Sequence, residues 1–260
     1  MFVSCPQAGK FMDQRVFKPL HTPACTVVCS TCNLREICLP VGLTLQELAQ
    51  VDQRLVTSRH KLARGEKLFQ TGDRFESVYA VWTGFFKTCI ASKDGREQVS
   101  GFQMGGELIG LDGIGTRRHE VDAVALEDSQ ICVIPYAELE TLSLEINSLQ
   151  QQFHRIMSRE IVRNHSVMLL LGSMHAEERL AAFLLNLTHR LQARGFSSSS
   201  VVLRMSREEI GSFLGLKLET VSRTFSKFQA DGLLFVRHRQ IQITDPVGLQ
   251  QVIDGDAETD

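Results

Sequence analysis

The chain has 260 residues, enough for one large domain or two modest ones, and its 43% apolar content supports hydrophobic cores. We expect no membrane span, since no run of eighteen apolar residues occurs, and no secretory signal, so the protein is predicted to be cytoplasmic. The formal net charge is −2, so any binding of nucleic acid has to rest on a local basic patch.

Four of the seven cysteines lie in one short stretch, CTVVCSTCNLREIC, from Cys25 to Cys38. Thiolates this close can converge on one metal centre. Tetrahedral zinc and an iron–sulfur cluster held by four thiolates both suit the spacing, and on spacing alone Cys25 is the nearest fourth ligand. A disulfide framework is disfavoured without a sign of export. The remaining alternative, cysteines that serve as small buried apolar residues, is disfavoured because four of the seven gather in one loop.

A short helix is predicted after the cysteine stretch, because Thr44 with Glu47 three residues later forms a capping-box pattern. From residue 61 to about residue 135, short β-prone runs alternate with glycine. Ten of the nineteen glycines fall between Gly65 and Gly115, a density that indicates repeated tight turns. These features predict a compact antiparallel barrel or jelly roll.

A single long helix is predicted next, because no proline or glycine interrupts the chain from about Asn147 to Leu171. Its seam residues are spaced four, three, four and three apart, the a/d pattern of a two-stranded coiled coil: Met157, Ile161, Asn164, Met168 and Leu171. The polar residue at the centre, Asn164, would fix register and partner number at a cost in stability. The pattern favours a homodimer, and the alternative is an amphipathic helix packed on its own domain.

The segment from Met205 to Gln229 has the pattern of two helices joined by a tight turn. Ser206 and Glu209 form a second capping-box pattern, and Gly215 supplies the turn, as in a helix-turn-helix. The following LFVRHRQIQIT reads as a β-hairpin wing, whose Arg237 and Arg239 could meet phosphates.

The second of these helices presents four polar residues outward: Glu219, Ser222, Arg223 and Lys227. Glutamate accepts from cytosine N4, arginine donates twice to guanine, and serine serves either base. From Met174 to Asp245 there are ten basic and seven acidic residues, a balance of +3 that permits DNA binding without proving it. The alternative is a solvated helix face.

Four motifs carry a resemblance to a known family: CSTCNLREICLP at 29–40, QVSGFQMGGELIGLDGIG at 98–115, HAEERLAAFLLNL at 175–187 and LGLKLETVSRTFSKFQ at 214–229. From about Cys25 to Thr244 the chain resembles the CRP/FNR superfamily of bacterial transcription regulators, in its FNR type. The resemblance implies an α+β fold, with an antiparallel β-roll sensor domain of cyclic-nucleotide-binding type, a long dimerisation helix and a winged helix-turn-helix. The expected divisions are a cysteine segment at 1–43, the sensor domain at 44–146, the dimerisation helix at 147–173, the DNA-binding domain at 174–246 and an acidic tail at 247–260.

The resemblance also implies an oxygen-responsive regulator. Its 4Fe–4S cluster would be held by Cys29, Cys32, Cys38 and the distant Cys132, would promote dimerisation without oxygen, and would be lost on oxidation by dioxygen. Cys25 has a counterpart in some relatives that is not a ligand. The family's base-contacting residues correspond to Glu219, Ser222 and Arg223, its half-sites resemble TTGAT and ATCAA, and surface loops such as residues 92–97 contact RNA polymerase.

Two positions depart from the family's patterns. Relatives that bind cyclic nucleotides have an Arg–Ser pair where this chain has Glu120 and Val121, so no cyclic nucleotide is expected. FNR-type proteins can carry an acid on the dimerisation helix where this chain has Asn164, with Glu160 the acid left nearby.

Two other functions stay open at this point. The first is a zinc-stabilised or thiol-switch regulator that uses the same helix-turn-helix. The second is an iron–sulfur electron-transfer protein or redox enzyme, which is disfavoured because the chain has no second cluster motif, no dinucleotide fingerprint and no catalytic constellation. We therefore predict that the protein is not an enzyme.

Overall fold

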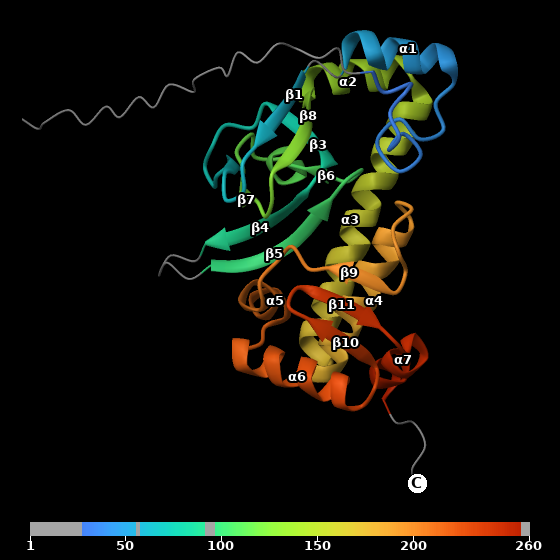
Figure 1. The fold of residues 1–260 in the computed structure, drawn as a ribbon. Helices are drawn as coiled ribbons and strands as arrows, with labels where there is room; N and C mark the ends of the chain where they lie inside the picture. The colour runs from blue at the N-terminus through green and yellow to red at the C-terminus, as the bar shows by residue number, and fades with distance from the viewer. Residues whose placement is uncertain (1–27, 56–57, 92–96, 256–260) are drawn as a thin grey trace, which may run out of the picture.

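The computed structural model describes residues 28–55, 58–91 and 97–255. Cys25, residues 92–96 of the predicted polymerase-contacting loop, and the last five residues of the predicted acidic tail lie outside this part. A β domain and a mostly helical domain lie at opposite ends of one long helix, α3 (Figure 1).

The β domain consists of two four-stranded sheets in which every strand pair is antiparallel, with strand orders β1-β8-β3-β6 and β2-β7-β4-β5. Its strands are β1 (Ser58–Leu62), β2 (Lys67–Phe69), β3 (Ser77–Thr83), β4 (Phe85–Ala91), β5 (Glu97–Met104), β6 (Leu108–Ile109), β7 (Asp122–Ala125) and β8 (Ser129–Pro135). Residues from both sheets share one core, in which Val81, Phe86 and Ile131 are buried. The predicted antiparallel β-roll is confirmed.

Two short helices lie at the end of the β domain beside the start of α3 (Figure 1): α1 (Leu45–Arg54) and α2 (Tyr136–Glu145). The capping box predicted for α1 is present, since the Glu47 amide donates to Thr44 Oγ1 at 3.3 Å and the Thr44 amide donates to Glu47 Oε2 at 2.7 Å. Helix α2 was not predicted. It has no side-chain cap at its first turn and is held by burial of one face, at Leu139 and Leu142.

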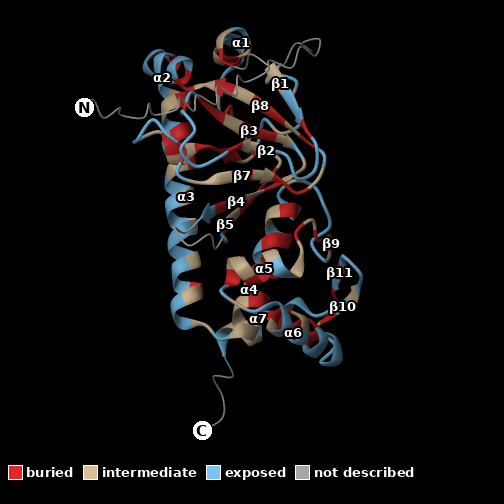
Figure 2. Cartoon of the chain, turned by 90° about the vertical axis from the view of Figure 1, so that its left-hand side faces the viewer, coloured by how far each residue is buried: buried red, intermediate tan, exposed pale blue. Residues whose placement is uncertain are grey.

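Helix α3 (Asn147–Ser173) confirms the predicted long helix. Its first half packs into the β domain, where Leu149, Phe153 and Ile156 are buried, and its last turn packs through Leu170 on the second domain. Between these ends much of its surface is open to solvent (Figure 2).

The second domain is built around the predicted helix-turn-helix. Its elements are α4 (Ala176–Gln192), β9 (Ser200–Val202), α5 (Arg207–Leu214), α6 (Leu218–Ala230), β10 (Leu234–Arg237), β11 (Gln240–Ile243) and α7 (Pro246–Asp254). The Ser206–Glu209 capping box opens α5, and Gly215 closes it with φ 64°, a conformation that favours glycine. Strands β10 and β11 form the predicted wing hairpin, with β9 as a third strand.

The predicted acidic tail at 247–260 begins as a helix that is packed on the second domain. Residues 246–254 form α7, which packs on α4 and buries Leu249 completely. Asp245 begins this helix by accepting a hydrogen bond from the Gly248 amide at 2.9 Å. Apolar burial therefore outweighs the acidic composition here.

Helix α5 is docked directly on strand β5 of the β domain. The Val99 amide donates to Ser212 Oγ at 2.9 Å, and the Lys87 ammonium lies 2.8 Å from the Glu209 carboxylate. The rings of Phe102 and Phe213 pack beside these contacts, 5.3 Å apart. The second domain and the β domain thus share an interface of their own besides α3.

Candidate metal centre and nucleic-acid interface

The cysteine loop is folded tightly on itself by backbone hydrogen bonds. The Cys32 amide donates to the Cys29 carbonyl at 3.1 Å, and the Cys38 amide donates to the Leu34 carbonyl at 2.9 Å. At its start, the amides of Cys29 and Ser30 both donate to the Asp52 carboxylate on α1. These contacts hold the three cysteines of the loop close together.

The fold brings the fourth cysteine to this loop. Cys29, Cys32, Cys38 and Cys132 all line one small cavity of about 30 Å³ between the loop and the sheet that contains β8. Cys132 lies on β8 between Ala80 of β3 and Arg59 of β1, the residues opposite it in register. The five cysteines that the structure describes are free thiols, and Cys89 of β4 lies in a different core cluster.

The site disfavours free thiolates. Burial raises the pKa of the Cys38 thiol to about 12 and also raises that of Cys132. Burial, with smaller contributions from Cys38 and Asp52, raises the pKa of the Cys29 thiol as well. Buried thiols become good thiolates when a metal replaces their protons.

The donor set fits a sulfur-ligated metal group. Four thiolates can hold a 4Fe–4S cluster, and four thiolates also suit structural zinc. Among the described side chains, no three His, Cys, Asp or Glu groups converge closely enough to hold a single metal ion. A cluster places each thiolate on a different iron atom.

The cysteine loop packs against the turn between β5 and β6. A Cβ atom at Gly106, whose φ is 84°, would lie 2.8 Å from the Ile37 side chain. One at Gly105 would lie 3.6 Å from Leu34. The contact at Gly105 has an ordinary van der Waals distance, whereas Gly106 lets Ile37 approach the backbone more closely than a side chain would allow.

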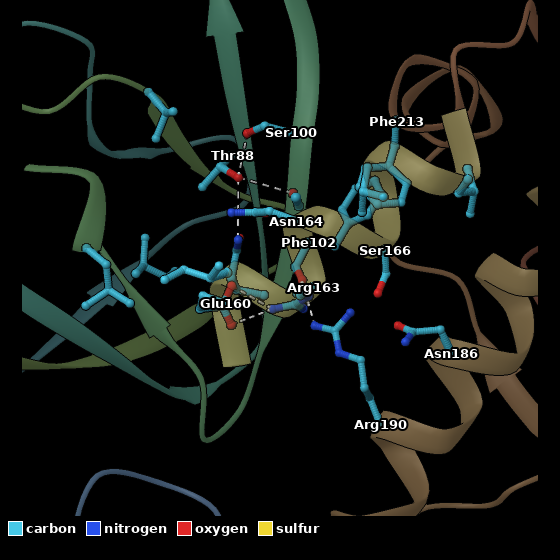
Figure 3. A pocket seen from close by; sticks show the side chains of 18 of the residues that line it. Thr88, Ser100, Phe102, Glu160, Arg163, Asn164, Ser166, Asn186, Arg190 and Phe213 are labelled. Atoms are coloured by element: carbon cyan, nitrogen blue, oxygen red, sulfur yellow. Dashed lines mark hydrogen bonds and ion pairs between the residues drawn. The ribbon is translucent and has the colours of Figure 1, made fainter. Parts of the chain in front are cut away.

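The next residue, Glu107, forms ion pairs with three arginines. Its carboxylate lies 2.6 Å from Arg190, 2.8 Å from Arg194 and 3.5 Å from Arg163. Arg163 of α3 and Arg190 of α4 also reach the Phe102 carbonyl of β5 (Figure 3). We refer to Glu107 and its three arginine partners as the Glu107 cluster.

The Glu107 cluster is largely shielded from water, with between 9% and 24% of each side chain exposed. Burial acts to raise the pKa of Glu107, but the guanidinium groups of Arg190 and Arg163 outweigh it and hold the pKa below its usual value. The cluster connects the β domain to both α3 and α4, and sequence patterns did not reveal it.

The four predicted DNA-binding residues lie together on one face of α6. Glu219, Arg223 and Lys227 are exposed and Ser222 is half-buried. The opposite face buries Val221, Phe225 and Phe228. Lys227 is already paired, since its ammonium lies 2.6 Å from the Glu177 carboxylate of α4.

The predicted seam of α3 is only partly open. Ile161, Asn164 and Met168 are exposed, whereas Met157 and Leu171 are half-buried against their own chain. Two apolar residues that the seam omitted, Val162 and Leu169, are also exposed. Val162 and Leu169 directly follow Ile161 and Met168 and are likewise seven residues apart. This shared repeat could have identified them as seam residues from the sequence. Together, Ile161, Val162, Met168 and Leu169 form the exposed stripe of α3.

Asn164 and Glu160 also face a second, larger cavity of about 760 Å³ (Figure 3), bounded by the β domain, α3 and α4. Glu120 lies outside its lining, and its amide donates to Asp112 Oδ2 at 2.7 Å. None of the helices that the structure describes is long and apolar enough to cross a membrane.

Comparison with known proteins gives consistent results. A model of the cyclic nucleotide-binding domain matches residues 59–145, and a model of the Crp-like helix-turn-helix domain matches residues 178–252. The transcriptional regulatory protein btr of Bordetella pertussis is 48% identical, over 86% of this chain and 93% of its own. The transcriptional activator protein Anr of Pseudomonas protegens is 44% identical, over 88% and 94%.

The fumarate and nitrate reduction regulatory protein of Escherichia coli K12 is 38% identical, over 92% of this chain and 96% of its own. Among solved structures, FixK2 from Bradyrhizobium japonicum superposes with a TM-score of 0.71 at 30% identity. That alignment covers 79% of this chain and 100% of FixK2.

Proposed function

Because this chain belongs to the CRP/FNR family of transcription regulators, in its FNR/Anr branch, we propose that it senses oxygen through a 4Fe–4S cluster on Cys29, Cys32, Cys38 and Cys132. The observation that carries the proposal is the cavity that these four thiols line together. The related regulators are not enzymes, and the chain is a DNA-binding regulator that we place in the cytoplasm.

A bound cluster supplies a centre that dioxygen can oxidise and dismantle. The protein's own residues tie the loop to the sheet through Cys132, and the loop then rests on Gly105 and Gly106. The next residue, Glu107, bonds to α3 and α4. Release of the loop therefore removes support from the turn that positions both helices.

Iron and sulfide analysis of protein purified without air tests this proposal. We expect about four irons and four sulfides per chain, since each of the four cysteines holds one iron of the cluster. Colourless protein that carries zinc instead would contradict the proposal and favour the zinc-stabilised regulator.

The proposal includes a homodimer formed through α3. Each of the four large apolar residues of the exposed stripe is more than half exposed, and monomeric proteins rarely leave such residues together in water. The exposed Asn164 beside it would set the register of the pair.

Leu169→Asp should break this dimer, because a buried carboxylate without a partner costs several kcal/mol. The matched control is Leu144→Asp on α2, since Leu144 is 83% exposed and Leu169 is 63% exposed. Anaerobic sedimentation should show a monomer for Leu169→Asp and a dimer for Leu144→Asp. Equal dissociation constants for the two variants would rule out a role of this stripe in dimerisation.

We further propose that the dimer binds a palindrome with TTGAT and ATCAA half-sites about one helical turn apart. Each α6 would read one half-site through Glu219, Ser222 and Arg223. Residues 92–97 would contact RNA polymerase. The β-roll is proposed to bind no cyclic nucleotide, because the Glu120 carboxylate would repel the phosphate.

Arg223→Ala should cost about 1–3 kcal/mol at one guanine of the half-site and relax the preference there. Arg237→Ala on the wing removes the same charge, and we expect it to weaken cognate and scrambled DNA equally, as a phosphate contact does. Lys227→Ala should have a smaller effect, because Glu177 already neutralises this lysine. Fluorescence anisotropy on both DNAs checks this. An equal loss on both for Arg223→Ala would restrict Arg223 to phosphate binding.

A further inference from the structure

Arg59 shares the cavity with the four cysteines. It lies on β1 directly opposite Cys132 of β8, and residues opposite each other in an antiparallel pair project to the same face of the sheet. Both line the cavity with Cys29, Cys32 and Cys38. The lining contains one other charged residue, Arg35, which is paired with Glu36 at 2.9 Å. The rest of the lining consists of thiols and apolar side chains, so Arg59 places an additional positive charge against the four cysteines.

The guanidinium of Arg59 is held in place by an aromatic ring. Its central carbon lies 3.8 Å from the centre of the Trp82 ring on β3, within the range of a cation–π contact. This contact fixes the plane of the guanidinium and limits its movement away from the cavity.

One donor of the Arg59 side chain, its Nε, has no hydrogen-bond acceptor in the described structure. The residue as a whole is half-buried, and its guanidinium lies within reach of the Cys132 thiol. Its Nε atom, however, is buried. A buried N–H that donates to nothing is costly, so its retention beside four thiols points to an anion that completes the site. Four thiolates with a 4Fe–4S cluster form a group of net negative charge.

We propose that Arg59 is a positioning residue for the cluster, with Nε donating to the Cys132 sulfur or to an adjacent cluster sulfide, and with Trp82 orienting the guanidinium. This inference rests on the proposed function. A cation and a sulfur hydrogen bond both stabilise the more reduced cluster, because charge and hydrogen bonding set the potential of such centres. Arg59 therefore raises the reduction potential and slows the loss of the cluster in air.

The test compares Arg59→Met with wild type after anaerobic purification. The visible absorbance is followed after exposure to air, and the reduction potential is measured separately. Residues that hydrogen-bond to metal ligands typically change metal affinity or activity about 10–100-fold when they are mutated. We therefore expect the absorbance of Arg59→Met to fade about tenfold faster than that of wild type, and its reduction potential to be lower. Arg59→Lys, which keeps the charge and loses Nε, should recover part of the difference.

The controls separate this role from a structural one. Arg64→Met removes an exposed arginine near the end of β1 and should bleach at the wild-type rate. The cluster-free Arg59→Met protein should melt at or above the wild-type temperature, because it no longer buries an unpaired donor. If circular dichroism shows that Arg59→Met is unfolded, Arg59→Gln gives the same comparison.

If Arg59→Met loses its absorbance at the wild-type rate and has the wild-type reduction potential, the proposed role of Arg59 is wrong, but the proposal of a cluster still stands. Wild-type protein without iron would instead refute the proposed function on which this inference rests. The two failures are therefore distinguishable in one series of samples.

Discussion

Replacing Cys132 with alanine is expected to reduce bound iron to background and to remove the dimer. The three remaining thiols all belong to the loop, so nothing would tie that loop to β8. If the cluster moves the chain from almost all monomer to almost all dimer, the bias lost is about 5.5 kcal/mol. Anaerobic iron analysis and sedimentation of the same sample measure both effects.

Cys89→Ala is the matched control for this change. Cys89 is as buried as Cys132, with 3% and 8% exposed, but it lies on β4 in a different core. Both variants lose one buried sulfur and leave a similar small void, so a general loss of stability would affect them alike. Full iron in Cys132→Ala, or equal iron loss in the two variants, would contradict the assignment of Cys132 as a ligand.

Glu107→Gln is expected to destabilise the fold by about 3–5 kcal/mol, the usual effect of removing one partner from a buried ion pair. Three guanidinium groups would remain beside a neutral amide, and Arg194 is the most buried of them, with 9% exposed. Urea denaturation of cluster-free protein gives the free energy of unfolding without interference from iron.

A matched control for charge is Glu177→Gln. Its carboxylate also pairs with a basic residue, Lys227, but the two side chains are 41% and 54% exposed. Solvent-exposed pairs contribute about 0–1 kcal/mol, so this variant should unfold almost as wild type does. Equal losses for the two variants would show that the Glu107 cluster adds no more than a surface pair.

The same cluster predicts a pH dependence of known sign. The pKa of Glu107 is lower in the folded chain than its ordinary value, so folding favours the charged form. Its stabilising contribution is complete above the unfolded pKa of a glutamate, about 4.3, and is lost as the pH falls through the lower folded value. The stability difference between wild type and Glu107→Gln should therefore shrink on acidification.

The fold was predictable wherever local chemistry decides it. The capping pairs Thr44–Glu47 and Ser206–Glu209 form as predicted because each pair lies within one turn of the chain. Helices α2 and α7 were missed for the opposite reason. Neither has a capping box, and the burial of Leu142 and Leu249 stabilises them in a way that only the folded chain reveals.

The candidate metal centre was predictable only in part. The spacing of Cys29, Cys32 and Cys38 indicated a metal site but did not distinguish zinc from an iron–sulfur cluster. Only the family resemblance pointed to Cys132 as the fourth ligand. Arg59 and Cys132 are far apart in the sequence, and they become neighbours only through the register of β1 against β8. Long-range contacts of this kind leave no periodic signal.

The helix seam shows a third kind of limit. An a/d pattern assigns the same role to all five residues, yet Met157 and Leu171 pack on their own chain. Both ends of α3 serve intramolecular cores while its middle stays open. Sequence periodicity cannot separate these uses, because all of them require an apolar residue at the same spacing.

The most direct test of the account follows one anaerobic sample before and after exposure to air, with sedimentation and binding to the TTGAT/ATCAA palindrome measured at each stage. We predict a coloured dimer that binds tightly, and then, as the colour fades, a shift toward monomer with the loss of half the DNA contacts per complex. A chain that stays dimeric and binds with unchanged affinity after its iron is gone would contradict the claim that the cysteine site controls DNA binding.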